Sequence, residues 1–176
     1  MVAGVALGGA AVSGGPGPAR GADDARALEL LMLVEYLEQA FYAQALRAGG
    51  LGAELRRYAE TVAEHEREHL AFLKRQLGAA APAEPDFDFG DAIRADDAFA
   101  DRAATIEDLA VAAYNGQGAN VSRATLKAAA SVVSVEARHA AWIRSIAGQP
   151  PAPDAVDTPK SAEAVLEGLE RAGMRR

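Results

Sequence analysis

The chain has 176 residues, half of them hydrophobic, which is enough for one domain with a single core and too few to indicate two full domains. Acidic residues outnumber basic ones by 25 to 18, so the net charge of −7 argues against nucleic-acid binding and provides no basic patch for an anionic membrane. Cysteine is absent, which excludes disulfides and thiolate ligands, so any bound metal must be held by carboxylate and imidazole groups.

Residues 1–22 differ in composition from the rest of the chain. Small apolar residues, with no charge before Arg20, lead into a stretch rich in glycine and proline. The apolar run is too short to span a bilayer, but it resembles the middle and end of a secretory signal, with Ala11 and Ser13 near a cleavage point. Because a basic start is missing, two interpretations stay open: a partial export signal, or a disordered tail on a cytoplasmic protein. In either case we expect the ordered domain to begin near Asp23.

From Asp23 onward the hydrophobic pattern is helical, and clusters of glycine or proline divide it into segments. The pattern predicts four long helices and a short last one, at about residues 23–48, 53–77, 98–114, 122–148 and 161–172. The first helix ends at two glycines and the second at Gly78, where a glycine can adopt the left-handed cap conformation. No segment is long and apolar enough to predict a transmembrane helix.

The lengths of the connections predict how the helices are arranged. The first and second helices are joined by a short link, and so are the third and fourth. The connection between the second and third is long and contains Pro82 and Pro85, which forbid helix, so it reads as a crossover. We therefore predict an all-α fold, with two antiparallel hairpins forming a four-helix bundle over residues 23–148 and a C-terminal extension with a short helix over 149–176.

Charged residues occupy positions on the apolar stripes of all four predicted long helices. The second helix has Glu66 and His69 at core positions, and the fourth has Glu136 and His139 at the same spacing of three. The first and third helices each place one glutamate on the apolar face. Six residues share this inward position: Glu35, Glu66, His69, Glu107, Glu136 and His139.

These positions form an internal repeat. Glu35 and Glu107 lie 72 positions apart and Glu66 and Glu136 lie 70 apart, while a tyrosine follows each of the first pair seven residues later, as Tyr42 and Tyr114. The repeat selects the first member of two ambiguous pairs as the inward residue: Glu35 over Glu38, and Glu107 over Asp108.

The chemistry of this set indicates a pair of metal ions. Four ionised glutamates in a bundle core would repel one another and be poorly solvated, whereas two divalent cations cancel their charge. One glutamate from each of two helices and Glu-x-x-His from each of the other two is the ligand set of di-iron and di-manganese carboxylate bundles. Residues three apart on a helix project to one side, so each motif can offer a bridging glutamate and a histidine for one ion. We therefore predict two iron or manganese ions as cofactors.

The roles of other polar and aromatic residues near the predicted ligands have more than one interpretation. His65 reads as a surface histidine rather than a hydrogen-bond partner of the site, and Glu64 and Glu68 read as solvated. For Tyr42 and Tyr114 the alternatives are a hydrogen bond to a ligand carboxylate, a redox role, or simple core packing. Trp142, one turn after His139, is expected to serve packing.

The four helix segments carry a family resemblance. The strings LVEYLEQAFYAQAL, AEHEREHLAFLKRQLG, IEDLAVAAYNGQ and SVEARHAAWIRSIAG resemble the helices of the bacterial ferritin-like domain family, which also includes plant desiccation-related proteins. The resemblance covers residues 27–148 and implies a ferritin-like four-helix bundle in which all six inward residues match ligand positions. It implies no storage cage, and members of the family often carry export signals.

These observations lead to one main functional prediction and two alternatives. The main prediction is a di-metal oxidoreductase that reacts with O2 or peroxide, as in Fe(II) oxidation or peroxide removal. The first alternative is a non-catalytic, metal-stabilised structural or stress-protective protein. The second is iron storage, which would require a large homo-oligomeric shell.

Overall fold

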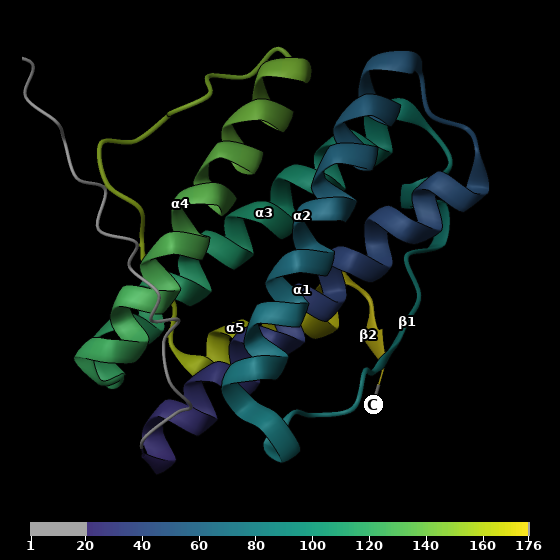
Figure 1. Ribbon diagram of the computed structural model, residues 1–176. Helices are drawn as coiled ribbons and strands as arrows, with labels where there is room; N and C mark the ends of the chain where they lie inside the picture. Colours follow the sequence, from purple (N-terminus) through teal and green to yellow (C-terminus); the bar gives the residue numbers. More distant parts are fainter. Residues whose placement is uncertain (1–20, 176) are drawn as a thin grey trace, which may run out of the picture.

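Five helices make up most of residues 21–175, the part of the chain that the computed structural model describes (Figure 1). They are α1 (Ala22–Ala48), α2 (Ala53–Leu77), α3 (Asp96–Gln117), α4 (Arg123–Ile146) and α5 (Ala162–Ala172). This confirms the predicted all-α fold of four long helices and one short C-terminal helix. The prediction of an export signal or disordered tail concerns residues that lie, apart from the last two, outside the described range.

The long helices pair as two hairpins joined by a crossover. Helix α1 packs along α2, and α3 packs along α4, while α1 also contacts α3 and α2 contacts α4. The crossover contains two short 3-10 helices, η1 (Gly78–Ala80) and η2 (Gly90–Ile93), separated by strand β1 (Asp86–Phe87). Each hairpin helix therefore has one neighbour from its own hairpin and one from the other, so four helix faces point at a common centre.

Helix α3 is longer than the predicted segment 98–114. It begins at Asp96 and continues through Gly116 to Gln117, where the sequence pattern indicated a break. The reason is a close approach of two backbones. A Cβ atom at residue 116 would lie 1.8 Å from the carbonyl oxygen of Lys160, and the Lys160 amide donates to the carbonyl of Ala112 at 2.9 Å. Gly116 therefore lets the backbone at Lys160 approach α3 closely, and it does not end the helix.

The C-terminal extension packs onto the bundle. Helix α5 contacts α3 and α1 and places Val165 and Leu169 in the same hydrophobic core as the long helices. After α5, strand β2 (Met174–Arg175) pairs antiparallel with β1 from the crossover, with Phe87 opposite Met174. The last described residues of the chain therefore pair with the crossover that connects the two hairpins.

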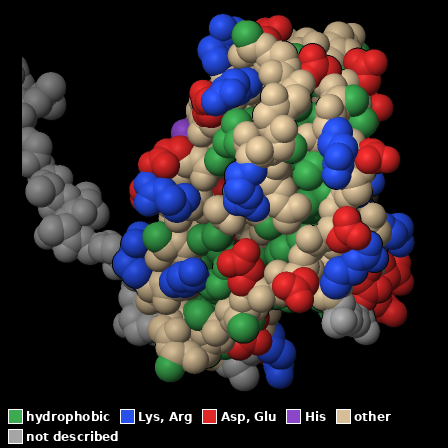
Figure 2. Space-filling model, turned by 90° about the vertical axis from the view of Figure 1, so that its right-hand side faces the viewer, with side chains coloured by type: hydrophobic (Ala, Val, Ile, Leu, Met, Phe, Trp, Pro, Cys, Tyr) green, Lys and Arg blue, Asp and Glu red, His purple; other side chains and the backbone are tan. Residues whose placement is uncertain are grey.

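Helices α1 and α3 are the most deeply buried elements. Helix α1 has buried residues on nearly every side, including Met32, Leu37 and Phe41, because α2, α3, α5 and the crossover all contact it. The aromatic ring of Phe41 stacks on Phe99 of α3 with ring centroids 5.1 Å apart. On the face of the molecule in Figure 2, acidic and basic side chains are interspersed. No helix among the described residues has the length and apolar character that crossing a membrane requires.

Candidate metal centre

The structure brings all six predicted inward residues together at the centre of the bundle. The four glutamates, one from each long helix, are completely buried, and His139 is nearly so. Their donor atoms form two groups in which all atoms lie within 4.8 Å of one another. The first group is Glu35, Glu66, His69 and Glu136, and the second is Glu107, Glu136 and His139.

Two glutamates each face both histidines. Glu136 places Oε1 2.8 Å from Nδ1 of His69 and Oε2 3.2 Å from Nδ1 of His139. Glu66 does the same from α2, with Oε2 3.0 Å from Nδ1 of His69 and Oε1 3.2 Å from Nδ1 of His139. Each carboxylate thus spans the space between the two imidazoles, which is the position of a carboxylate that bridges two ions.

The other two glutamates each face one histidine. Oε2 of Glu35 lies 3.2 Å from Nδ1 of His69, and Oε2 of Glu107 lies 3.5 Å from Nδ1 of His139. The resulting arrangement is nearly two-fold symmetric, with two spanning carboxylates in the middle and one carboxylate at each end. This symmetry reflects the internal repeat, because each half of the chain supplies one terminal glutamate and one Glu-x-x-His motif.

The donor set fits a pair of cations. Each Nδ1 faces three carboxylate oxygens but can carry only one proton, so hydrogen bonding cannot satisfy all of them. Among the described side chains, each of the four glutamates keeps one buried oxygen without a hydrogen-bond partner: Glu35 Oε2, Glu66 Oε1, Glu107 Oε2 and Glu136 Oε1. Buried carboxylate oxygens without partners are strongly unfavourable, and cations between them would satisfy all four. A set rich in carboxylate with two imidazoles suits iron or manganese.

The pKa values show how the cluster is balanced when no cation is bound. Burial raises the pKa of Glu107 to about 7, and burial together with the charge of Glu136 raises the pKa of Glu35 well above its ordinary range. Burial opposes charge on His139, but hydrogen bonds with its carboxylate neighbours raise its pKa to about 12. In the same way, hydrogen bonds from the histidines overcome burial and lower the pKa of Glu66 to about 2. The metal-free site therefore uses histidinium ions and carboxyl protons as its positive counter-charges.

The two tyrosines of the repeat donate hydrogen bonds across the bundle. Tyr42 of α1 donates to Oε1 of Glu107 in α3, and Tyr114 of α3 donates to Oε1 of Glu35 in α1. Burial, followed by the charge of the glutamate, raises the pKa of both phenols, so they remain donors. Each hydrogen bond fixes one oxygen of a terminal carboxylate and leaves the other directed at a histidine.

Comparison with known proteins identifies the fold. A family model described as a ferritin-like domain matches residues 23–149, which include the four long helices. The chain belongs to the ferritin-like domain family. No curated protein sequence matches the chain. Since the matched region contains the whole Glu/His cluster, the ferritin-like fold and the cluster together indicate that this protein can bind metal.

One buried tyrosine of this ferritin-like domain was missed by the sequence pattern. The hydroxyl of Tyr58 in α2 lies 3.2 Å from Oε1 of Glu107 and 3.1 Å from the hydroxyl of Tyr42. Trp142 covers it edge-on, with ring centroids 5.0 Å apart, so the prediction that Trp142 serves packing agrees with its contact. The apolar stripe of the second helix, with its spacing of three and four, passes through Ala59 rather than Tyr58. The sequence pattern therefore did not predict that Tyr58 faces the site.

The prediction that His65 is a surface residue was wrong. Its side chain is partly buried, and its Nδ1 lies 2.8 Å from Nε2 of His139, with the two rings stacked. His65 precedes His69 by four residues, so it lies on the same side of α2 and reaches α4. If Nδ1 of His139 binds a cation, its Nε2 carries the proton and donates it to Nδ1 of His65.

Glu38 is also inside the ferritin-like domain. The repeat favoured Glu35 over Glu38, yet both are completely buried, and both carboxylate oxygens of Glu38 lack a hydrogen-bond partner within residues 21–175. By contrast, Asp108, the alternative to Glu107, is part of the surface and pairs with Arg144.

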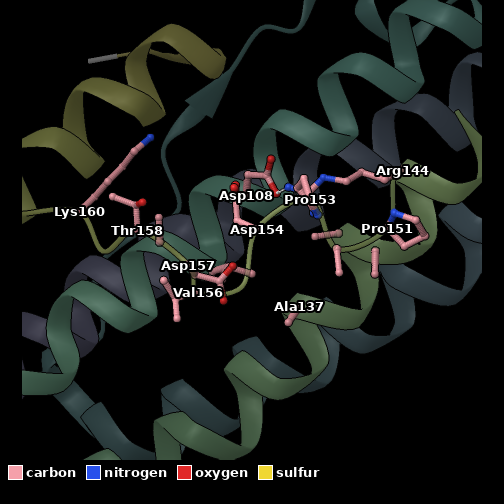
Figure 3. A pocket seen from close by; sticks show the side chains of 15 residues that line it. Asp108, Ala137, Arg144, Pro151, Pro153, Asp154, Val156, Asp157, Thr158 and Lys160 are labelled. Atoms are coloured by element: carbon pink, nitrogen blue, oxygen red, sulfur yellow. Dashed lines mark hydrogen bonds and ion pairs between the residues drawn. The ribbon is translucent and has the colours of Figure 1, made fainter. Parts of the chain in front are cut away.

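A separate pocket lies between α3, α4 and the segment that leads to α5 (Figure 3). It encloses about 400 Å³, and Asp108, Arg144 and Lys160 contribute charged groups to its wall. The six inward residues do not line it, although Ala137 and Ala140 on its wall adjoin Glu136 and His139 in sequence. The pocket is thus a surface feature beside the metal centre and not the centre itself.

Proposed function

We propose that this ferritin-like domain binds two iron or manganese ions and uses them to react with O2 or peroxide, as in Fe(II) oxidation or peroxide removal. The observation that carries the proposal is the placement of Glu66 and Glu136, each of which presents one oxygen to each histidine. Two cations shared by Glu66 and Glu136 would lie close together, the arrangement in which one small oxidant can reach both.

The protein residues have distinct tasks in this proposal. A bound pair of iron or manganese ions supplies the electron transfer and the free coordination positions that O2 or peroxide requires. The spanning carboxylates hold the two positions together, and Glu35 and Glu107 close the two ends. Tyr42 and Tyr114 keep their phenolic protons and donate hydrogen bonds to Oε1 of the terminal glutamates, which holds Oε2 of each toward the centre. The apolar surroundings exclude bulk water.

Among the residues of the candidate metal centre, His69 is the one through which a small molecule could most readily reach the site. Its side chain is 12% exposed, whereas that of His139 is 3% exposed and those of the four glutamates are fully buried. A small neutral molecule such as O2 or hydrogen peroxide therefore has its shortest route to the centre along this histidine.

A non-catalytic role is the second candidate. Complete burial of four glutamates favours a protein in which the ions serve to neutralise the core and stabilise the bundle. Such a structural or stress-protective protein would bind the same two ions but consume no oxidant. Iron storage is a third candidate and would require a large homo-oligomer.

Metal analysis followed by activity measurement tests the proposal. Protein purified without chelator, or stripped and reloaded with Fe(II) or Mn(II), should contain about two ions per chain. Loaded protein should consume hydrogen peroxide or oxidise Fe(II) with O2, and Glu136→Ala should lose both the ions and the activity. The matched control is Glu64→Ala, an exposed glutamate of α2 that pairs with Arg67. Absence of bound metal would refute the proposal, whereas two ions without activity would favour the structural role, and size-exclusion chromatography would reveal a storage shell.

A further inference from the structure

Glu38 is a buried carboxylate that the six-residue set does not explain. It follows Glu35 by one turn of α1 and is completely inaccessible to solvent. Neither Oε1 nor Oε2 has a hydrogen-bond partner in the described part of the chain. Each of the four glutamates described above retains at least one tyrosine or histidine partner, so Glu38 differs from all of them.

Glu38 lies within electrostatic range of the four glutamates of the cluster. Its charge interacts with a glutamate from each of the four long helices: Glu136, Glu66, Glu107 and Glu35. Burial first, and then these charges, raise its pKa well above the ordinary range in the metal-free protein. The side chain is thus buried near the cluster, one helical turn from Glu35, although its oxygens lie outside the two compact groups of donor atoms.

The internal repeat shows that Glu38 is an addition to the symmetric site. The offset of 72 that relates Glu35 to Glu107 relates Glu38 to Ala110, which is also completely buried. One half of the bundle thus has a carboxylate where the other half has a methyl group. An unpaired buried carboxylate is costly, and the core of this helix could have used an alanine here as α3 does.

The number of protein donor atoms available to each ion suggests a role for Glu38 as an additional ligand. If each carboxylate oxygen that faces a histidine binds one ion, each ion receives one imidazole nitrogen, one terminal oxygen and one oxygen from each of Glu66 and Glu136, a total of four. Iron and manganese with oxygen-rich ligands favour octahedral surroundings with about six donors, so both ions keep free positions. A buried carboxylate one helical turn from Glu35 can fill one of them after a rotation of its side chain.

We propose that Glu38 is a seventh protein ligand, which coordinates one of the two ions when the centre is loaded. The inference rests on the proposed di-metal function. It makes the centre asymmetric, with five protein donors at one ion and four at the other, so that the two positions differ in affinity and the four-donor ion is the one left more open to a small oxidant.

Cobalt titration of the full chain tests this assignment, because the visible absorption of Co²⁺ reports its coordination number. Metal-free wild type, Glu38→Gln and Glu29→Gln would be titrated with Co²⁺ at pH 7 by calorimetry and absorption spectroscopy. Wild type should bind two Co²⁺ in two steps. Glu38→Gln should still bind two, with one step weakened by about tenfold or more and a changed spectrum, since even an indirect partner of a metal ligand costs 10- to 100-fold in affinity. Glu29 lies on the same helix but is partly exposed, so its variant should behave as wild type.

The outcomes separate this inference from the proposed function. If Glu38→Gln binds both Co²⁺ ions with wild-type affinity and spectrum, Glu38 is not a ligand, while the di-metal function stands. If wild type binds no Co²⁺, the di-metal function itself fails. Metal-free Glu38→Gln should melt close to wild type, which shows that a weaker step is not caused by misfolding. If it does not fold, Glu38→Asp retains the charge but withdraws the oxygens, and it should show the same weakened step.

Discussion

Metal removal should reverse the way in which the stability of this protein responds to pH. In the metal-free form the pKa values of the buried carboxyl groups of Glu35 and Glu107 are raised, so their protonation favours the folded state over the unfolded state. The stability that such a group contributes is fully present below its unfolded pKa and is lost as pH rises through its folded pKa. The metal-free protein should therefore become more stable as pH falls from 8 toward 5.

Glu107 provides the magnitude. Its pKa is raised from 4.5 to about 7, and at 1.4 kcal/mol per pKa unit this corresponds to about 3 kcal/mol lost between these two values as pH rises. His139 acts in the same direction, because its pKa is raised from 6.5 to about 12 and its contribution begins to decline above pH 6.5. Glu66, with its pKa lowered to about 2, has the opposite sign: its contribution is present above pH 4.5 and is lost as pH falls toward 2, which sets the acid limit.

The metal-loaded protein should show the opposite trend between pH 8 and 5. Its ligands must be deprotonated to bind, so protons compete with the ions as pH falls. At a thousandfold excess of metal over its dissociation constant, one bound ion stabilises the folded state by roughly 4 kcal/mol, and this difference should shrink in acid. Differential scanning calorimetry of both forms from pH 5 to 8 measures both slopes. For a chain of this size, about 3 kcal/mol corresponds to roughly 6–12 °C in Tm. Identical melting curves for the two forms would refute the reasoning, and so would a metal-free Tm that rises from pH 5 to 8.

Three further predictions concern single residues. Glu66→Ala should reduce the bound metal from two ions to at most one per chain, measured by elemental analysis, and full occupancy would contradict its bridging role. His65→Leu should weaken metal binding by about tenfold because Nε2 of His139 loses its acceptor, while His65→Gln, which keeps an acceptor oxygen, should bind within a few-fold of wild type in the same titration. Gly116→Ala should destabilise the fold by about 1–3 kcal/mol in urea denaturation, since its Cβ would clash with the backbone of Lys160, and wild-type stability would disprove this contact.

The helices and the six inward residues could be predicted because helical periodicity is a local property. Glu66 and His69 share a face whatever the rest of the chain does, and a carboxylate on an apolar stripe is conspicuous without knowledge of its partner. The repeat then linked Glu66 to Glu136 at an offset of 70 and Glu35 to Glu107 at an offset of 72, so the four-helix cluster could be predicted from local patterns and these two nearly equal offsets. The position of Glu66 and Glu136, each facing both histidines, is a further consequence of the packing of α2 against α4.

Three features could not be predicted, and each has a physical reason. The hydrogen bond between His65 and His139 joins residues 74 positions apart, and only the packing of two helices determines it. Strands β1 and β2 have two residues each, too few to show any alternation of polar and apolar side chains. The burial of Glu38 was missed because the repeat assumes that the two halves are alike, whereas this residue is where they differ.

Charge balance leads to a last prediction, the number of protons that leave when the ions enter. A buried centre tolerates little net charge, so the four positive charges of two divalent ions must displace positive charge already present. In the metal-free protein protons on His69 and His139, whose pKa values are both raised, supply that charge, and the raised pKa values of Glu35 and Glu107 favour their protonated, neutral forms.

At pH 7 both histidines are protonated and Glu107, with a pKa of about 7, is half protonated, so these three groups should release about two to three protons per chain when metal binds. Glu35 and Glu38, whose pKa values are also raised by burial, add to this number. The number should increase between pH 8 and pH 6 as Glu107 gains its proton. Calorimetric titration in buffers of different ionisation enthalpy counts these protons directly. Release of fewer than about one proton would mean that the histidines are neutral before metal binds, and that the carboxylates of the empty centre are balanced in some other way.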